Sequence, residues 1–122
     1  MRVLLIDDEE EFVATLAERL RLRGIAADWT TSAEAGLRRA AETTYDIAVL
    51  DVKVPGVSGI DLKSRIQALS PETKYIFLTG HGSEKDFIAG KSISEFYLIK
   101  PVQIDDLVEK LQIATGQTGA QS

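Results

Sequence analysis

The chain has 122 residues, of which 44% are hydrophobic and 27% are charged, and its formal net charge is −5. This length and composition are typical of one globular domain and argue against a largely disordered chain. The acidic balance argues against nucleic-acid binding by this domain's own charge, and the absence of cysteine excludes disulfides, thiolate nucleophiles and zinc–thiolate sites.

The apolar run at the start of the chain is too short for a signal peptide, and no segment approaches the length of a transmembrane helix. We therefore expect no membrane partner. The lack of cysteine also fits a reducing compartment, so the sequence favours a cytoplasmic protein.

The first predicted elements are a strand and a helix, separated by four acids. Residues 3–6 are all apolar, as in a strand that is buried on both faces of a parallel sheet. Apolar residues then recur at helical spacing over residues 11–23, before a glycine. The acids, DDEE at residues 7–10, precede this helix, and arginines lie toward its end, an order that suits the helix dipole. The dipole accounts for the two glutamates, but it accounts less well for the two aspartates because they close the strand.

A weaker strand and a helix follow. Residues 25–30 are predicted to form a strand at an edge of the sheet, because an aspartate interrupts the apolar pattern. The next helix is expected to run to about residue 42. Thr31 and Glu34 have the spacing of a capping box at its start, and Gly36 should weaken it.

The most informative stretch is DIAVLDVKVPGVSG, residues 46–59. An unbroken apolar run over residues 47–50 predicts a buried central strand, and Asp51 follows at its carboxyl end, where open α/β sheets bind their ligands. A lone aspartate at this point more often caps a turn, so its significance depends on the other strand ends. A loop with proline and glycine then leads into a predicted helix over residues 58–69.

Two further predicted strands also end in polar side chains. Residues 75–78 form an apolar run followed by Thr79, and residues 96–99 form another followed by Lys100. A short fourth helix is expected between these strands, beginning near residue 83.

The end of the chain contains a last predicted helix over residues 104–111 and then a polar segment. This segment has no apolar pattern. We therefore expect one domain over residues 1–114, followed by a flexible tail or linker over residues 115–122.

Strand and helix patterns alternate five times, which predicts an α/β fold with a doubly wound five-stranded parallel sheet and helices on both faces. In a parallel sheet the carboxyl ends of the strands lie along one edge. The polar groups at these ends should therefore meet. They are Asp7, Asp8, Asp51, Thr79 and Lys100.

Three carboxylates at one sheet edge repel one another unless a cation lies among them. An all-oxygen ligand set without histidine or cysteine favours a hard ion, and Mg²⁺ typically takes one or two carboxylates, several waters and a phosphate oxygen. Asp51 would then be a nucleophile, while Lys100 and Thr79 would supply donors for phosphoryl oxygens. The pattern therefore predicts phosphoryl chemistry.

With these residues in this order and at strand ends, the sequence resembles the bacterial response-regulator receiver domain, the phosphoacceptor half of two-component signalling. The resemblance runs from about Arg2 to Leu111. Its motifs are an acidic pair (Asp7, Asp8), an aspartate followed by proline and glycine (Asp51, Pro55, Gly59), a strand-end threonine (Thr79) and a lysine–proline pair (Lys100, Pro101). The resemblance implies a flavodoxin-like sheet with strand order 2-1-3-4-5.

The resemblance also implies a chemical role for the acidic residues. Asp51 would take a phosphoryl group from the phosphohistidine of a sensor histidine kinase or a phosphotransfer protein, which would give an acyl phosphate. Asp8 and Asp51 would bind Mg²⁺ directly, together with the main-chain carbonyl of Lys53, and Asp7 would act through water. Such a domain is a phosphoacceptor with at most slow self-dephosphorylation, and we do not expect an enzyme.

A switch is implied as well. Lys100 would pair with the phosphate, and the Lys100–Pro101 peptide bond would be cis. Thr79 would turn toward the phosphate and Tyr97 would follow it inward, although core packing accounts for Tyr97 equally well. The response would be a population shift at the face of the fourth helix, fifth strand and last helix, which would control an output domain or a downstream protein in transcription. A phosphorylation-dependent dimer is one form that the response could take.

Some features leave alternatives open. Residues 84–96 depart from the family's alanine-rich fourth helix, so we expect a shortened or mobile helix, and Val54 stands where methionine is usual. The LTGHGS stretch at residues 78–83 looks like receivers of enhancer-binding transcription activators, and the polar tail favours a receiver cut from a longer regulator. A free-standing receiver that docks on a partner is the alternative. A Mg²⁺-dependent phosphohydrolase is less favoured, because the haloacid-dehalogenase family needs an aspartate two residues after the nucleophile, where this chain has Lys53.

Overall fold

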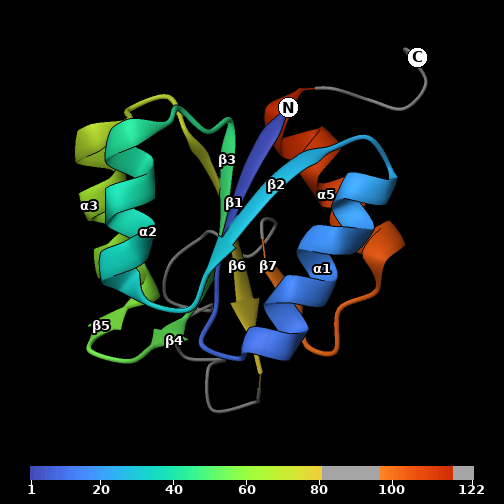
Figure 1. Ribbon diagram of the computed structural model, residues 1–122, viewed down its shortest axis with the longest axis horizontal. Helices are drawn as coiled ribbons and strands as arrows, with labels where there is room; N and C mark the ends of the chain where they lie inside the picture. The colour runs from blue at the N-terminus through green and yellow to red at the C-terminus, as the bar shows by residue number, and fades with distance from the viewer. Residues whose placement is uncertain (81–96, 117–122) are drawn as a thin grey trace.

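The computed structural model describes residues 1–80 and 97–116, which form a parallel sheet between two layers of helices (Figure 1). The elements in chain order are β1 Arg2–Ile6, α1 Glu10–Leu22, β2 Ala26–Thr30, α2 Ala33–Glu42, β3 Ile47–Asp51, β4 Lys53–Val54, β5 Val57–Ser58, α3 Gly59–Leu69, β6 Lys74–Thr79, β7 Tyr97–Ile99 and α5 Ile104–Thr115. The segment of the predicted fourth helix, residues 84–96, lies outside the described residues. Within the described ranges, none of the helices has the length and apolar character that a membrane crossing requires.

The central sheet has the strand order β2-β1-β3-β6-β7, and every neighbouring pair in it is parallel. Because β6 and β7 are the fourth and fifth strands of this sheet along the chain, the predicted order 2-1-3-4-5 is confirmed. β2 lies at an edge, as its interrupted pattern predicted. β3 lies in the middle, and all five of its residues are buried.

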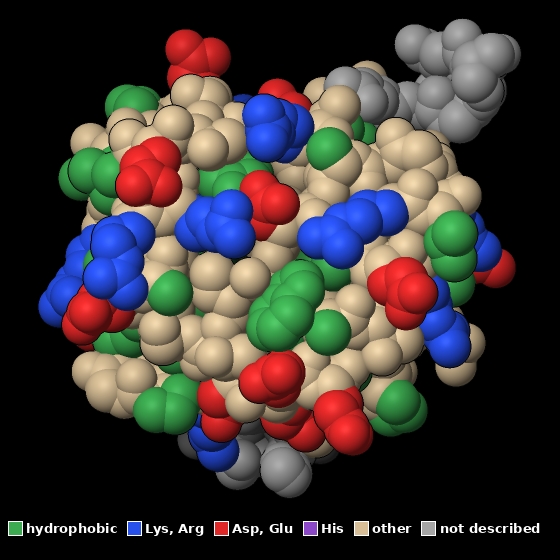
Figure 2. All heavy atoms as spheres, viewed as in Figure 1, with side chains coloured by type: hydrophobic (Ala, Val, Ile, Leu, Met, Phe, Trp, Pro, Cys, Tyr) green, Lys and Arg blue, Asp and Glu red, His purple; other side chains and the backbone are tan. Residues whose placement is uncertain are grey.

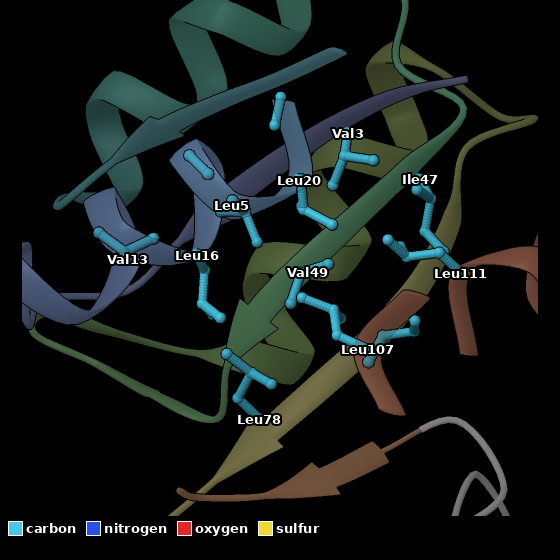
Figure 3. Packing of buried hydrophobic residues seen from close by; sticks show 13 residues of the cluster. Val3, Leu5, Val13, Leu16, Leu20, Ile47, Val49, Leu78, Leu107 and Leu111 are labelled. Carbon is cyan, nitrogen blue, oxygen red and sulfur yellow. The ribbon is translucent and has the colours of Figure 1, made fainter. Parts of the chain in front are cut away.

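Helices cover both faces of the sheet and bury two apolar clusters. In Figure 1, α1 and α5 lie on one side of the sheet, and α2 and α3 lie on the other. Figure 3 shows the cluster on the α1 and α5 side, where Leu16 and Leu20 of α1 and Leu107 and Leu111 of α5 surround Val49 of β3. Within each helix these leucines are four residues apart, so they share the face that the sheet covers. Burying each of them contributes about 2 kcal/mol to folding.

Two strands extend one residue further than their apolar runs predict. Main-chain pairing continues to the ends of β3 and β6, where Asp51 pairs with Leu78 and Thr79 pairs with Ile99. The sheet therefore holds the main chain of both polar residues. α5 is also longer than predicted, since it continues to Thr115.

The predicted capping box at the start of α2 is wrong by one residue. Ser32 is the N-cap, in an extended conformation with φ −134° and ψ 152°, and its hydroxyl accepts a hydrogen bond from Ala35 N at 3.2 Å. Thr31 lies one residue before this cap, so it does not form the box with Glu34. Glu34 instead pairs with Arg38 across one helical turn, at 3.7 Å.

A short antiparallel hairpin, β4 and β5, takes the place of the loop expected after Asp51. Lys53 pairs with Ser58, and Val54 pairs with Val57. Val54 is buried in the cluster on the α2 and α3 side, which anchors the hairpin to the core. Strands of two residues are too short to give a periodic pattern, so the sequence did not predict them.

Gly36 lets α2 pack closely against β1. A Cβ atom at this position would overlap Ile6 Cδ1, and it would lie 3.0 Å from Ile6 Cγ1 and 3.4 Å from Thr30 Oγ1. Ile6 is fully buried, so its side chain has little space into which to move. The glycine that lowers helix propensity therefore permits the contact between this helix and the sheet.

Replacing Gly36 by alanine should destabilise the protein, although alanine is the better helix former. Overpacking costs about 1–3 kcal/mol, and the gain in helix propensity is about 1 kcal/mol, so we expect the free energy of unfolding to fall by up to about 2 kcal/mol. Chemical denaturation measures this change. The double variant Gly36→Ala/Ile6→Val lacks the overlapping methyl group, so it should lose less stability than the sum of the two single variants. Strict additivity of the two changes would contradict the contact.

Candidate functional site

Four strand ends bring polar side chains to one edge of the sheet. Asp7 follows β1, Asp51 ends β3, Thr79 ends β6 and Lys100 follows β7. Lys100 N donates to Thr79 O at 2.8 Å, so the main-chain ladder continues to the lysine. One carboxylate oxygen from each of Asp7, Asp8 and Asp51 lies within 4.8 Å of the others. The fold therefore brings together the acidic residues and the lysine that the sequence singled out.

The two buried aspartates are held by the same kind of main-chain contact. Asp7 Oδ1 accepts a hydrogen bond from Glu9 N at 2.9 Å, and Asp51 Oδ1 accepts one from Lys53 N at 3.1 Å. In both cases the amide two residues further along the chain fixes one carboxylate oxygen. The other oxygen is the one nearer to Lys100, whose Nζ lies 2.8 Å from Asp7 Oδ2 and 3.6 Å from Asp51 Oδ2.

The three carboxylates differ in their access to solvent. Asp7 is fully buried and Asp51 is 6% exposed, whereas Asp8 is exposed. In Figure 2, acidic side chains gather at the lower edge of the molecule, where α1 begins in Figure 1. An open pocket of about 570 Å³ at this site is lined by Asp8, Glu9, Phe12, Asp51, Lys53, Gly80, Lys100 and Pro101. A ligand can reach Asp51 through this pocket.

Burial and close charges change the protonation of the site. Burial raises the pKa of Asp51 to about 6. The hydrogen bond from Lys53 N lowers this pKa, and the negative charge of Asp7 raises it further. Burial also raises the pKa of Asp7, although the contact with Lys100 opposes this increase. Burial alone would lower the pKa of Lys100, but its close contacts with the carboxylates of Asp7 and Glu9 outweigh that effect and raise it. The lysine therefore stays cationic, while the carboxylates are hard to ionise together.

The donor set fits a hard divalent cation. The acidic cluster found among the described residues offers carboxylate oxygens from Asp7, Asp8 and Asp51 and contains no histidine or cysteine. Asp7 Oδ2 is buried and receives no well-directed hydrogen bond from the described part of the chain, and its close neighbour is the Lys100 ammonium. The Lys100 ammonium does not by itself balance three carboxylates, and Mg²⁺ is bound by oxygen ligands of this kind. These residues therefore fit Mg²⁺, and the carbonyl of Lys53 stays a predicted ligand.

Gly59 lets the start of α3 approach the strand that carries Asp51. Its N–H donates to Val52 O at 3.1 Å. A Cβ atom at this position would lie 2.9 Å from Val52 Cα and 3.0 Å from Asp51 O, and these main-chain atoms cannot move aside without moving the strand end. Close packing therefore explains the glycine that follows Asp51 by eight residues.

The two predicted switch residues lie on neighbouring strands. Thr79 is 1% exposed, and Tyr97 is half-buried against the apolar cluster on the α2 and α3 side. Phe77 pairs with Tyr97 and Thr79 pairs with Ile99, so strand alternation puts Thr79 and Tyr97 on the same face of the sheet. Core packing of Tyr97 is thus observed, while its movement with Thr79 stays a prediction.

Sequence reasoning missed two contacts of Lys100. Its Nζ lies 2.6 Å from Glu9 Oε1 and 4.8 Å from the centre of the Phe12 ring. The helix dipole accounted for Glu9 and apolar spacing accounted for Phe12, so neither pattern indicated a lysine that follows Glu9 by 91 residues. These contacts arise only because the start of α1 lies beside the end of β7. The Lys100–Pro101 peptide bond there is cis, as the resemblance implied.

Residues 3–112 of this chain match the family model of the response regulator receiver domain. Among curated relatives, the uncharacterized transcriptional regulatory protein YkoG of Bacillus subtilis (strain 168) is 31% identical over 121 residues, which cover 98% of this chain and 53% of YkoG. The chain therefore spans about half the length of the curated relatives that it matches.

Solved structures with similar sequences have the same fold. A response regulator receiver domain protein from Clostridium thermocellum is 31% identical, with a TM-score of 0.81 and 94% of both chains covered. A response regulator protein from Burkholderia pseudomallei, whose crystal structure has a phosphorylated aspartic acid, a calcium ion and citrate, is 27% identical. Its TM-score is 0.79, and the match covers 98% of this chain and 71% of that one.

Asp51→Asn should stabilise the metal-free protein above the pKa of Asp51. The pKa of Asp51 rises from 3.8 to about 6 on folding. Between pH 3.8 and about 6, the folded state therefore keeps a proton on Asp51 that the unfolded state releases. The free energy of unfolding of the wild type thus falls as the pH rises through this range. We expect the free energy of unfolding of the variant to exceed that of wild type by about 1–3 kcal/mol near pH 7.5, and the difference to vanish near pH 4.

Denaturation in the presence of EDTA at both pH values measures this effect. Glu72→Gln, which neutralises an exposed acid between α3 and β6, is the control and should change stability little at either pH. An equal gain for Asp51→Asn at both pH values would contradict a raised pKa of Asp51.

Proposed function

The chain belongs to the response regulator receiver domain family, and from this membership we propose that Asp51 accepts a phosphoryl group from the phosphohistidine of a sensor histidine kinase or a phosphotransfer protein. The observation that supports this proposal is the placement of the Asp51 carboxylate at the pocket. One of its oxygens accepts a hydrogen bond from Lys53 N at 3.1 Å, and the other lies 3.6 Å from the Lys100 ammonium. The carboxylate is thus oriented by the main chain and faces a cation.

In the proposed transfer, Asp51 Oδ2 attacks the phosphorus atom of the phosphohistidine. The new oxygen–phosphorus bond forms as the nitrogen–phosphorus bond breaks, and the histidine of the donor keeps the electron pair and takes up a proton. Lys100 donates to an equatorial phosphoryl oxygen, and the Thr79 hydroxyl donates to another. The product is an acyl phosphate on Asp51.

Asp8 and Asp51 would hold Mg²⁺, with the carbonyl of Lys53 and with Asp7 acting through water. When bound, the ion would offset the negative charge that develops on the phosphoryl oxygens. One carboxylate oxygen from each of Asp7, Asp8 and Asp51 lies within 4.8 Å of the others, so the chain itself assembles the acidic set. We propose a phosphoacceptor with at most slow self-dephosphorylation.

The output is proposed from the relatives. YkoG is a transcriptional regulatory protein of about twice this chain's matched length, so we propose that residues 1–114 are a receiver and residues 115–122 a linker toward an output domain that controls transcription. Phosphorylation would shift the face that includes β7 and α5, with Thr79 and Tyr97 moving together, and this shift could act through a dimer. The domain itself would act in the cytoplasm, without direct contact to nucleic acid or membrane.

Incubation with Mg²⁺ and acetyl phosphate tests the proposed acceptor. We expect a mass increase of one phosphoryl group that is labile in base, because an acyl phosphate is the expected product. The increase should be absent in Asp51→Asn and in EDTA, and Lys100→Ala should slow the reaction about 100-fold because it removes a donor to the transition state. Intact-protein mass spectrometry over time measures all four reactions.

Asp61→Asn is the matched control, since Asp61 is an exposed aspartate in the first turn of α3 and should not affect the rate. Full modification of Asp51→Asn would place the phosphoryl group elsewhere. Multiple-turnover hydrolysis of several phosphomonoesters would instead indicate a phosphohydrolase.

A further inference from the structure

Glu9 holds Lys100 in the structure, although the proposed function needs Lys100 at the phosphoryl group. The Lys100 ammonium lies 2.6 Å from Glu9 Oε1 and 2.8 Å from Asp7 Oδ2, both hydrogen-bonding distances. Its distance to Asp51 Oδ2 is 3.6 Å, which is too long for a direct hydrogen bond. The lysine is therefore held on the α1 side of the pocket.

The Glu9 side chain does not serve the helix that follows it. Glu9 is the N-cap of α1, yet its carboxylate makes no capping hydrogen bond. Glu10 and Glu11 already supply the acidic charge in the first turn that suits the helix dipole. The contact with Lys100 is thus the interaction that accounts for the position of the Glu9 carboxylate.

Two acids compete with a phosphoryl group for the Lys100 ammonium. An ammonium has three N–H donors, and contacts with Asp7 and Glu9 occupy two directions while the Phe12 ring lies 4.8 Å away. A phosphoryl group on Asp51 carries more negative charge than the carboxylate that it modifies. It therefore draws the ammonium away from one of its present partners.

Glu9 is the partner that is easier to release. The Asp7 side chain is 0% exposed, so losing Lys100 would leave a buried carboxylate without a counter-charge. The Glu9 side chain is 60% exposed, so water can replace the ammonium around it. The exposure of the two acids decides which contact breaks.

We propose that Glu9 is a positioning residue that competes with the phosphoryl group on Asp51 for Lys100, and so weakens the binding of a phosphoryl group at this site. This inference rests on the proposed function. No proton moves in the exchange, since Lys100 stays an ammonium and Glu9 stays a carboxylate. Release of Glu9 would also free the start of α1 from the end of β7, two segments that this ion pair joins.

Binding of beryllium fluoride in the presence of Mg²⁺ tests the competition, with amide NMR shifts as the measure of affinity. Glu9→Gln should bind beryllium fluoride about 2- to 5-fold more tightly than wild type, the range expected when one exposed ion pair no longer has to break. Glu10→Gln and Glu11→Gln remove the same charge from exposed neighbours in the first turn of α1, and they should change the affinity much less. Glu9→Ser removes the carboxylate but supplies a good N-cap, so it should behave like Glu9→Gln.

A second readout uses the metal-free protein. The ¹⁵Nζ resonance of Lys100 should shift in Glu9→Gln and in Glu9→Ser, and its ammonium protons should exchange faster with water, because one hydrogen bond is lost. In the Lys100→Ala background, Glu9→Gln should no longer change the affinity for beryllium fluoride. If the Glu9 substitutions only destabilised α1, the Lys100 resonance would not shift, and the effect of Glu9→Gln on affinity would not depend on Lys100.

Equal tightening in Glu9→Gln and Glu10→Gln would show a general effect of charge and would overturn the inference. An unchanged affinity of Glu9→Gln for beryllium fluoride would also overturn it. The same holds if Glu9→Gln still changes this affinity in the Lys100→Ala background. Failure of the proposed function looks different, since wild type would then bind no beryllium fluoride, or Asp51→Asn would bind it equally well. In that case the inference falls together with the proposal on Asp51.

Discussion

The structure depends on the balance of charge at one edge of the sheet, where carboxylates gather around the Lys100 ammonium. Parallel strands bring their carboxyl ends together, and two of the aspartates that result, Asp7 and Asp51, are almost fully buried. Burial raises the pKa of each, and the charge of Asp7 raises the pKa of Asp51 further. Lys100 relieves the repulsion between these carboxylates only in part. The remaining imbalance fits a divalent cation at the pocket, and on this basis we propose a role for Asp51 beyond capping a turn.

Much of the fold and the core of the site could be predicted from the sequence because both follow from unbroken apolar runs. Such runs locate buried strands, and the residue that ends a buried strand must lie at the sheet edge, which is how Asp51 and Lys100 were found. Glu9 and Phe12 were missed since each already satisfied a local pattern, one the helix dipole and the other the apolar face of α1. Helix and strand patterns extend over one element, so they cannot indicate a contact between residues that are 91 positions apart.

The errors at the element level also have local causes. Ser32 and Thr31 are chemically similar neighbours, and only the backbone conformation shows which hydroxyl reaches the Ala35 amide. The β4–β5 hairpin has two residues in each strand, so its pairing depends on the buried Val54 and not on alternation. Gly36 was judged by helix propensity alone. Its value lies in the contact with Ile6, which depends on the distance between α2 and β1.

α5 ends at Thr115, and Figure 1 shows its end on the opposite side of the molecule from the strand ends that form the pocket. Its 12 residues span about 18 Å, so its two ends lie far apart on the molecule. A module joined to the chain beyond this helix would be too far from a group on Asp51 to contact it. Such a module would respond only to a movement of α5, which the leucines packed against the sheet would transmit along the helix.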